Sequence, residues 1–349
     1  MSTQANHIGR ARKRGIVIGT LPSGENNSIT DVSGVHVGHE SISEGEIQTG
    51  ITVVSPHAVT DENALYFYGK YTDGSGGEMT GYSVMDDFGL LASPVFMANL
   101  LSVGRIYNGA ITYGFIRSSG LSTSGGWPPI VMGFDDRVLN DMTARRLTED
   151  HALKALNGAS SDNAEEGNVG AGVGAVSFGF KGGIGTSSRV IERGGKTYTV
   201  GSLVLANYGS YAEFLDESEA NPAENLYPSL LGVVATNAAL PSPVLNTLAA
   251  GAAYGAADIG SVRKPAGSYQ IVSFSTGIAV REPNRAGIYD LEFAPNVSHA
   301  ELRQGAREAT TEAVLSALSA ATTLTGSGGR TAHSMSDEMI GKLIRVANG

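Results

Sequence analysis

The sequence predicts a layered protein of the α/β or α+β class, in which strands pack beneath long helices. Hydrophobic residues make up 41% of the 349 residues, which is enough to bury a large core. The 47 glycines and 12 prolines are typical of many tight turns between short strands. Three long segments with apolar residues at three- and four-residue spacing predict helices.

Seven segments are predicted as strands from their β-branched residues and the turn residues at their ends: 15–18, 34–37, 50–54, 130–132, 197–206, 230–236 and 270–275. The three predicted helices span 141–156, 242–257 and 298–321. Ser242 followed by Pro243 supplies a start signal for the second helix. Ser298 with Glu301 three residues later forms a capping box for the third.

Other stretches are predicted to lack regular structure: 71–81, 158–166 and the glycine-rich run 167–185. The polar segment 210–228 ends in proline and predicts an exposed loop rather than a domain linker. We find no internal repeat, and we expect one domain over residues 1–349.

Composition excludes several classes of function. The formal net charge of −10 argues against binding to nucleic acid, since the one basic cluster is the short stretch 10–14. The absence of cysteine excludes disulfides, thiolate catalysis and Cys-ligated metals. No apolar run has membrane-spanning length and no secretory signal is recognisable, so we expect a cytoplasmic protein that does not bind membranes.

Known cofactor and metal motifs do not fit either. The run 170–174 has the wrong spacing for a GxGxxG fingerprint, and no P-loop occurs. His36 and His39 would point to opposite faces of a strand, which is poor for one metal ion. No HExxH or GxSxG motif is present. We therefore expect no metal and no organic cofactor.

Ser229 is the candidate nucleophile. It opens an apolar strand directly after the polar segment 210–228, an arrangement that suits an enzyme that cuts its own chain. In such enzymes the amine freed at the new N-terminus acts as the base for the hydroxyl of the same residue. The alternative is that Ser229 is an ordinary strand-edge residue.

Two further polar residues could take part in chemistry. Asn207 ends an apolar strand, where its amide could donate to a developing oxyanion, although Asn near Gly is also common in turns. Glu78 lies in a glycine-rich loop that would allow close approach to a ligand, although it could equally be a solvated loop acid.

Several motifs taken together resemble the L-aminopeptidase/D-amino-acid esterase and β-aminopeptidase family, and more distantly the nylon-oligomer hydrolases. They include SPVFMANLLSVG, EEGNVGAGVGAVSFGFKGGIGTSSRV, YTVGSLVLANYG, SLLGVVATNAAL and AATTLTGSGGR, in this order along the chain. The resemblance implies an α+β fold, a four-layer αββα sandwich of the type shared with ornithine acetyltransferase. It also implies a homo-oligomer, with a tetramer favoured.

The family resemblance also assigns roles. The nucleophile falls on Ser229 and the oxyanion-stabilising amide on Asn207. Self-cleavage would fall between Pro228 and Ser229, which would divide the protein into an α chain of residues 1–228 and a β chain of residues 229–349.

The sequence departs from the family pattern at three places. A serine and an acid separated by glycine are expected before the last predicted strand, where this chain has Gly267, Ser268 and Tyr269. A glutamate expected after the WPPIVM strand is replaced by Gly133. The residue before the nucleophile is Pro228, whose fixed φ alters the bond to be cut.

These departures set the remaining expectations. Glu78, Gly133, Ser268 and Tyr269 are the predicted substrate-binding residues, and Asp135, Asp136 or Glu78 could replace the missing carboxylates. The leading hypothesis is a serine aminopeptidase or amidohydrolase that acts on N-terminal residues, small amides or esters. The alternatives are an uncleaved relative that catalyses a cyclisation, condensation or elimination in specialised metabolism, and a scaffold without catalytic activity.

Overall fold

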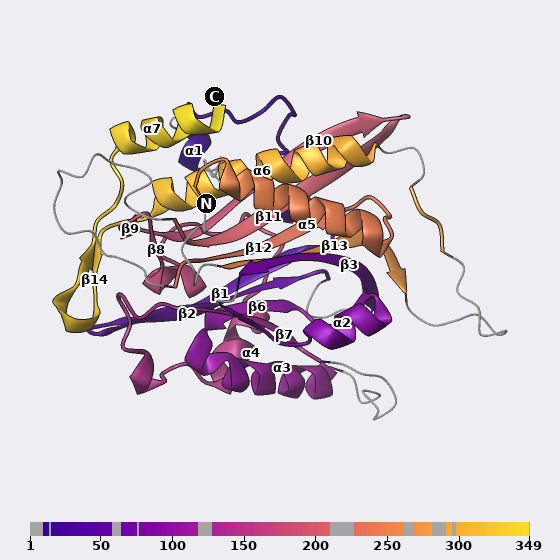
Figure 1. Cartoon of the computed structure of the whole chain (residues 1–349). Coiled ribbons are helices and arrows are strands. Elements are labelled where there is room, and N and C mark those ends of the chain that lie inside the picture. The colour runs from indigo at the N-terminus through magenta and orange to yellow at the C-terminus, as the bar shows by residue number, and fades with distance from the viewer. Residues whose placement is uncertain are drawn as a thin grey trace, which may run out of the picture.

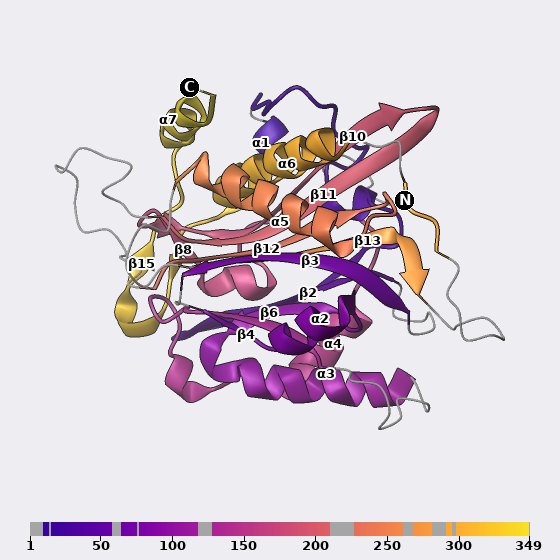
Figure 2. The ribbon, with the colours of Figure 1, turned by 45° about the vertical axis from the view of Figure 1, so that its right-hand side comes forward.

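Two β-sheets face each other at the centre of this computed structural model, and helices cover the outer face of each (Figure 1). The structure describes residues 10–13, 15–57, 64–74, 77–117, 128–209, 227–260, 268–280, 291–294 and 298–348. The turned view shows the layers in the order helices, sheet, sheet, helices (Figure 2). This is the four-layer αββα sandwich of the α+β class that the family resemblance implied.

The first sheet has five strands in the order β1-β2-β6-β7-β4. They are β1 (His36–Glu44), β2 (Ile47–Ser55), β6 (Val95–Asn99), β7 (Ile130–Phe134) and β4 (Glu78–Met79). Strands β6 and β7 are parallel, whereas the other neighbours are antiparallel. The helices α3 (Val103–Arg117) and α4 (Glu149–Asn157) cover its outer face (Figure 1).

The second sheet has six strands in the order β10-β11-β12-β13-β3-β5. They are β10 (Gly183–Arg193), β11 (Lys196–Asn207), β12 (Ser229–Thr236), β13 (Ser268–Val280), β3 (Leu65–Gly74) and β5 (Leu90–Leu91). Only β12 and β13 pair in parallel among these strands. The helices α5 (Ser242–Ala257) and α6 (His299–Ala320) cover its outer face (Figure 1).

The remaining elements lie around these layers. They are α1 (Arg10–Lys13), α2 (Tyr82–Phe88), α7 (Asp337–Asn348), β8 (Val176–Ser177), β9 (Phe180–Lys181), β14 (Leu324–Thr325), β15 (Thr331–Ala332) and the short 3-10 helices Ile29–Asp31, Leu100–Ser102, Met142–Ala144, Gly170–Gly174 and Ser327–Gly329.

Side-chain alternation along the strands divides the apolar residues among separate cores. On β12, Leu231 and Val233 join the core between the two sheets, while Leu230 and Val234 join the core beneath α5 and α6. A third core lies between the five-stranded sheet and the helices α3 and α4. Strands that are buried on both faces read as continuous apolar runs, which is why they were recognisable in the sequence.

Most predicted elements are confirmed, and α5 has the predicted bounds. The segment 15–18, however, is not a strand. The Ile18 carbonyl accepts a hydrogen bond from the Arg189 guanidinium at 2.9 Å, and just beyond the segment the amides of Thr20 and Leu21 donate to the Glu308 carboxylate at 3.1 Å each. Side chains of other elements therefore take the backbone groups that a strand would need.

The helix predicted over 141–156 begins only at Glu149. Asp141 instead caps the 3-10 turn Met142–Ala144, and Arg145 ends that turn with a φ of 46°. Thr148 and His151 then form the capping box at the start of α4. Local capping therefore outweighs the apolar periodicity of the segment.

The stretches predicted to be irregular contain more structure than expected. The run 167–185 holds a 3-10 helix, β8, β9 and the start of β10, while β3 extends to Gly74. Glycine is needed here for close approach: a Cβ at Gly185 would lie 2.0 Å from the Ala313 carbonyl oxygen of α6. The predicted exposed loop 210–228 lies outside the described residues except for Tyr227 and Pro228.

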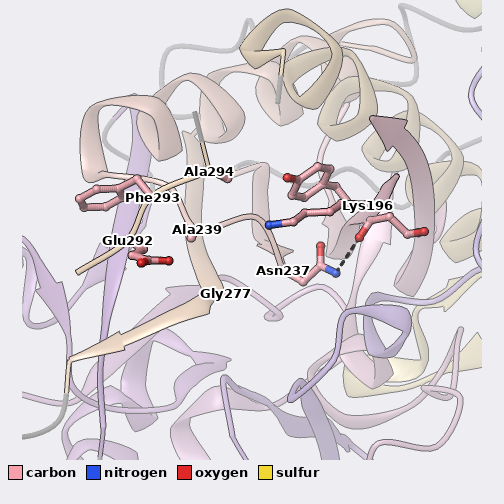
Figure 3. Close-up of a pocket in the computed structure, with 9 residues that line it drawn as sticks. Lys196, Asn237, Ala239, Gly277, Glu292, Phe293 and Ala294 are labelled. Carbon is pink, nitrogen blue, oxygen red and sulfur yellow. Dashed lines mark hydrogen bonds between the residues drawn. The ribbon is translucent and has the colours of Figure 1, made fainter. Parts of the chain in front are cut away.

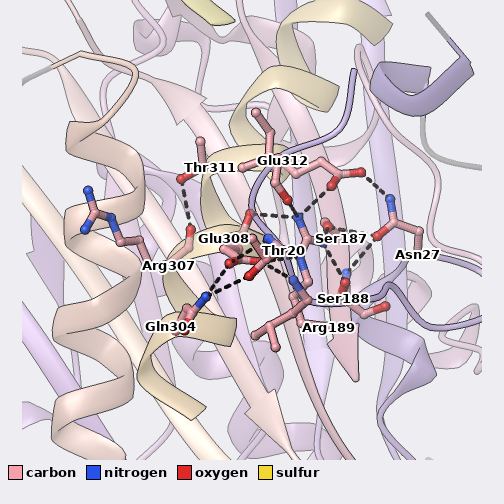
Figure 4. Close-up of polar contacts among 12 residues, drawn as sticks. Thr20, Asn27, Ser187, Ser188, Arg189, Gln304, Arg307, Glu308, Thr311 and Glu312 are labelled. Carbon is pink, nitrogen blue, oxygen red and sulfur yellow. Dashed lines mark hydrogen bonds and ion pairs between the residues drawn. The ribbon is translucent and has the colours of Figure 1, made fainter. Parts of the chain in front are cut away.

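A buried cluster of charges joins α6 to β10 and to the N-terminal segment (Figure 4). Arg189 is fully buried, and its guanidinium binds the carboxylates of Glu308 at 3.2 Å and Glu312 at 2.7 Å. Glu312 also accepts hydrogen bonds from Arg12 at 2.7 Å and from the Asn27 amide at 2.6 Å. A charge taken out of water is tolerated only when it is paired in this way.

We expect Glu312→Ala to lower the free energy of unfolding by about 3–5 kcal/mol, because it leaves the Arg189 charge buried with one partner fewer. Chemical denaturation of both proteins measures the difference. Glu301→Ala is the matched control, since Glu301 lies on the same helix and pairs with the half-exposed Arg193. If the two substitutions shift the denaturation midpoint equally, the buried cluster has no special role.

Candidate functional site

One end of the six-stranded sheet brings three predicted residues into a single row. Ser229, the first residue of β12, pairs in register with Asn207 of β11 and with Ser268 of β13. Directly paired residues point to the same face of a sheet, and Leu205, Leu231 and their neighbours place this face between the two sheets. All three polar residues are buried, with at most 2% of their surface exposed.

Ser229 is held by hydrogen bonds on both sides of its hydroxyl. The Ser268 Oγ donates to the Ser229 Oγ at 3.2 Å, and the Ser229 Oγ donates to the Tyr227 carbonyl oxygen at 3.3 Å. The Pro228 carbonyl oxygen accepts a hydrogen bond from the Ser268 amide at 2.9 Å. The peptide bond before Ser229 therefore lies inside the hydrogen-bond ladder of the sheet.

Asn207 is oriented by two segments that are distant in the sequence. Its Oδ1 accepts from the Val176 amide at 2.9 Å, and its Nδ2 donates to the Asp135 carbonyl oxygen at 3.0 Å. These bonds fix which end of the amide faces each neighbour. Such an arrangement goes beyond the simple turn that the sequence left open as an alternative.

A buried lysine supports the segment that orients Asn207. The Lys181 Nζ donates to the carbonyl oxygens of Gly172, Ala175 and Gly182 at 2.8, 3.0 and 2.8 Å. Burial lowers the pKa of Lys181 to about 7, while three carbonyl dipoles favour the protonated form. Sequence reasoning missed Lys181, although a lysine inside a glycine-rich run was a visible signal.

Gln270 lies two positions after Ser268 on β13, so its side chain points to the same face of the sheet as the Ser229 side chain. Its side-chain amide, in the orientation that satisfies both ends, donates to the Glu78 carbonyl oxygen at 2.8 Å and accepts from the Glu78 amide at 3.3 Å. Gln270 thus ties β13 to β4 of the other sheet. The residues on this face are therefore Ser268 and Gln270, one position later than the 267 and 269 pair named from the sequence.

Two predicted substrate-binding residues, Gly133 and Tyr269, are not brought to Ser229. Gly133 pairs with Glu78, and a Cβ at Gly133 would lie 2.9 Å from the side chains of Leu100 and Val103 and 3.3 Å from the Glu78 Cβ, on the α3 side of its sheet. Tyr269 lies in the core beneath α5, where its hydroxyl donates to the Gly260 carbonyl oxygen at 3.4 Å. Residue 267 lies outside the described residues.

This placement changes what the missing family carboxylates at positions 133 and 269 mean for the site. A carboxylate at position 133 or 269 would point into a helical layer and away from Ser229. The described neighbours that do face Ser229's side, Ser268 and Gln270, carry no charge. A shift of one residue in a strand reverses the face, and the sequence comparison alone could not exclude that shift.

The proposed replacement acids have other partners. Asp135 pairs with the Arg137 guanidinium at 2.6 Å. The fully buried Asp136 carboxyl accepts from the Thr49 hydroxyl at 2.6 Å and from the Asn140 amide at 2.9 Å. Burial raises the pKa of Asp136 to about 7. Asp135 contributes to the site through its backbone carbonyl, which binds Asn207.

A surface cavity of about 460 Å³ lies elsewhere, at the opposite end of β12 (Figure 3). Lys196, Asn237, Glu292 and Phe293 are among its lining residues, and Ser229 is not. Because a strand rises about 3.3 Å per residue, the eight residues of β12 separate the cavity from Ser229 by roughly 20 Å. It is distinct from the Ser229 site.

Among the described residues no group of three histidines or acids is arranged to hold a metal ion. The two histidines noted in the sequence have separate partners: the His36 ring binds the Gly34 carbonyl at 2.9 Å, and the His39 ring binds the Thr52 hydroxyl at 3.0 Å. Within the same ranges, no helix combines the length and hydropathy that crossing a membrane requires.

Comparison with known proteins connects the chain to a family. Residues 27–332 match the sequence profile described as "Peptidase family S58". A β-peptidyl aminopeptidase, BapA, from Sphingosinicella microcystinivorans is 34% identical over 92% of this chain and 88% of its own length.

Solved structures agree with the fold. An L-aminopeptidase D-Ala-esterase/amidase from Ochrobactrum anthropi, described as a variant of the Ntn hydrolase fold, is 28% identical, with a TM-score of 0.86 over 97% of this chain and 98% of that one. A β-aminopeptidase from a Burkholderia species is 30% identical, with a TM-score of 0.82 over 97% and 99%.

The raised pKa of Asp136 predicts a pH effect on stability. Between about pH 4 and 7 the folded protein keeps a proton that the unfolded chain releases, so this group's contribution to stability falls as the pH rises through that window. We expect Asp136→Asn to remove that fall, as measured by denaturation midpoints at pH 4.5 and 7. Asp141→Asn is the control, because the pKa of exposed Asp141 is lowered by its bonds to Thr143; equal pH profiles for wild type and Asp136→Asn would contradict the assignment.

Proposed function

The chain belongs to peptidase family S58, and from this membership we propose that it is a serine aminopeptidase or amidohydrolase whose nucleophile is the Ser229 hydroxyl. The observation that carries the proposal is the buried row in which the Ser229 Oγ contacts the Ser268 Oγ at 3.2 Å and pairs in register with Asn207. Their positions in the sequence and the family resemblance both pointed to Ser229 and Asn207. Their shared face supports a joint role.

The proposed reaction is acyl transfer. The Ser229 Oγ attacks the carbonyl carbon of an amide or ester, and the Asn207 amide stabilises the charge that develops on the carbonyl oxygen. A hydroxyl needs a base, and the amine freed by cleavage before Ser229 would serve as one. In this mechanism Ser268, whose Oγ donates to the Ser229 Oγ at 3.2 Å, would relay the proton between them. The bond from the carbonyl carbon to the leaving amine or alcohol breaks, and the proton taken from the serine passes to that group. Water then hydrolyses the acyl-enzyme, which releases the acid and restores the serine.

Self-cleavage before Ser229 is part of the same proposal. It would give chains of residues 1–228 and 229–349. The Pro228 carbonyl oxygen already accepts the Ser268 amide hydrogen, which is the type of donor that stabilises an oxyanion. Assembly into a homo-oligomer, with a tetramer favoured, remains a prediction of the family resemblance.

The substrates we propose are small amides, esters or N-terminal residues of peptides. Ser268 and Gln270 offer hydrogen bonds but no negative charge on Ser229's side. A site lined by carboxylates would favour a substrate whose acyl group carries a charged amine. This uncharged surface should instead favour an acyl group without one.

The same neutrality favours one second candidate. An uncleaved enzyme could use Ser229 and Asn207 for a cyclisation, condensation or elimination, since such reactions need no counter-charge for a substrate amine. Turnover of amides or esters by a cleaved protein would exclude it.

Ser229→Ala tests the nucleophile. We expect the purified wild-type protein to consist of two chains divided between Pro228 and Ser229, and the variant to remain one uncut chain without turnover of amino-acid amides, p-nitroanilides or esters. Intact-mass spectrometry and a substrate panel measure both results. Equal turnover by the two proteins would sink the proposal.

Asn207→Asp tests the oxyanion donor. The variant keeps an oxygen that can accept from the Val176 amide but loses the amide donor, so we expect kcat to fall about 10²- to 10³-fold. Asn237→Asp is the matched control, because Asn237 directly follows β12 and its Oδ1 also accepts from a backbone amide, that of Thr199, but at the far end of the sheet. A similar kcat for both variants would remove Asn207 from the mechanism.

A further inference from the structure

We propose that Arg137 and Tyr227 form a clamp that positions the chain before Ser229 for self-cleavage. This inference rests on the proposed function of Ser229. The Arg137 Cζ lies 4.9 Å from the centroid of the Tyr227 ring, within the range of a cation–π contact. Tyr227 lies two residues before the nucleophile and would stand at the C-terminal end of the 1–228 chain after cleavage.

The backbone explains why a side-chain anchor is needed here. From Ser229 onward the chain is held by the ladder bonds of β12 to β11 and β13. Pro228 has no amide hydrogen, so on its N-terminal side the ladder cannot continue through that residue. Its carbonyl is held by the Ser268 amide at 2.9 Å. The next group upstream that can fix the chain is Tyr227.

Tyr227 is held at two points. Its carbonyl oxygen accepts from the Ser229 Oγ at 3.3 Å, and its ring contacts Arg137. A nucleophile reacts quickly only when the reacting atoms are held in the correct relative orientation. Fixing both the ring and the carbonyl of Tyr227 limits rotation of the Pro228 carbonyl against the Ser229 hydroxyl.

Arg137 is itself anchored to the site. Its Nε lies 2.6 Å from the Oδ2 of buried Asp135, and this contact raises the pKa of Arg137, so the guanidinium stays charged. Its carbonyl oxygen accepts from the Arg330 guanidinium at 3.0 Å. The Asp135 carbonyl in turn binds the Asn207 amide at 3.0 Å. One turn after β7 therefore holds both the segment that precedes the cleavage point and the proposed oxyanion donor.

The clamp would assist self-cleavage before Ser229, a reaction that needs no reagent other than water. The Ser229 Oγ forms a bond to the Pro228 carbonyl carbon, the bond from that carbon to the Ser229 nitrogen breaks, and the Oγ proton ends on that nitrogen. Water then cleaves the ester, leaving a carboxylate on Pro228 and a free hydroxyl and amine on Ser229. Arg137 and Tyr227 act as positioning residues in the first step.

A double-mutant cycle tests the clamp. The wild-type chain and the variants Tyr227→Ala, Tyr227→Phe, Arg137→Ala and Tyr227→Ala/Arg137→Ala are made by cell-free translation, and cleavage is followed by intact mass. We expect Tyr227→Ala to slow cleavage about 2- to 5-fold, the loss that corresponds to one partly exposed cation–π contact. Tyr227→Phe keeps the ring and should cleave at the wild-type rate.

Arg137→Ala should slow cleavage at least as much as Tyr227→Ala, because it also leaves buried Asp135 without its cation. The double variant should cleave no more slowly than Arg137→Ala alone. Once cut, the Tyr227→Ala protein should have wild-type kcat and KM, which a general loss of structure would not allow.

Three results would overturn the clamp. Cleavage of Tyr227→Ala at the wild-type rate shows that the ring contact does not matter, and multiplicative effects in the double variant show that the two residues act separately. A wild-type chain that stays uncut, like Ser229→Ala, removes the clamp together with self-cleavage. The first two leave the proposed nucleophile standing, so the two failures can be told apart.

Discussion

The alternation of side chains along paired strands is the constraint on which this protein depends. In two sheets packed face to face, every strand residue faces either the other sheet or a helical layer. At one end of the six-stranded sheet this rule brings Asn207, Ser229 and Ser268 to the same buried face. The same rule turns Tyr269 into the helical core, although it is the direct neighbour of Ser268. The candidate site and the helical core are thus separated by a single step along the chain.

Sequence reasoning predicted what depends on local pattern. Strands buried on both faces and the helices α5 and α6 have strong periodic signals and clear caps, and Ser229 and Asn207 stood at strand ends. The segment 15–18 was misassigned because Arg189 and Glu308 bind its surroundings from far along the chain. Gln270 and Lys181 were missed for the same reason, since their partners lie in other elements. Pairing in register was the one signal that could have placed Gln270, and register is fixed by tertiary structure.

Two buried cations show how polar groups specify the fold. Arg189 meets carboxylates from α6, whereas Lys181 donates to three backbone carbonyl oxygens. Neither group gains much net energy from leaving water, because desolvation offsets the attraction. Both restrict which segments can come together, since any other packing would leave a charge unpaired. In this protein they hold the N-terminal segment against α6 and the glycine-rich turn against Asn207.

The strand order has a topological consequence for a chain that is cut before Ser229. In the order β10-β11-β12-β13-β3-β5, the two strands that follow the cut are enclosed between β11 and β3, both of which precede it. The fragment 229–349 would supply β12 and β13, and the fragment 1–228 would supply the strands on both sides of them. Neither fragment could therefore complete the sheet by itself. A nick would therefore leave the two pieces interlocked, and dilution would not separate them. They would come apart only by unfolding together, as one cooperative body with two extra chain ends.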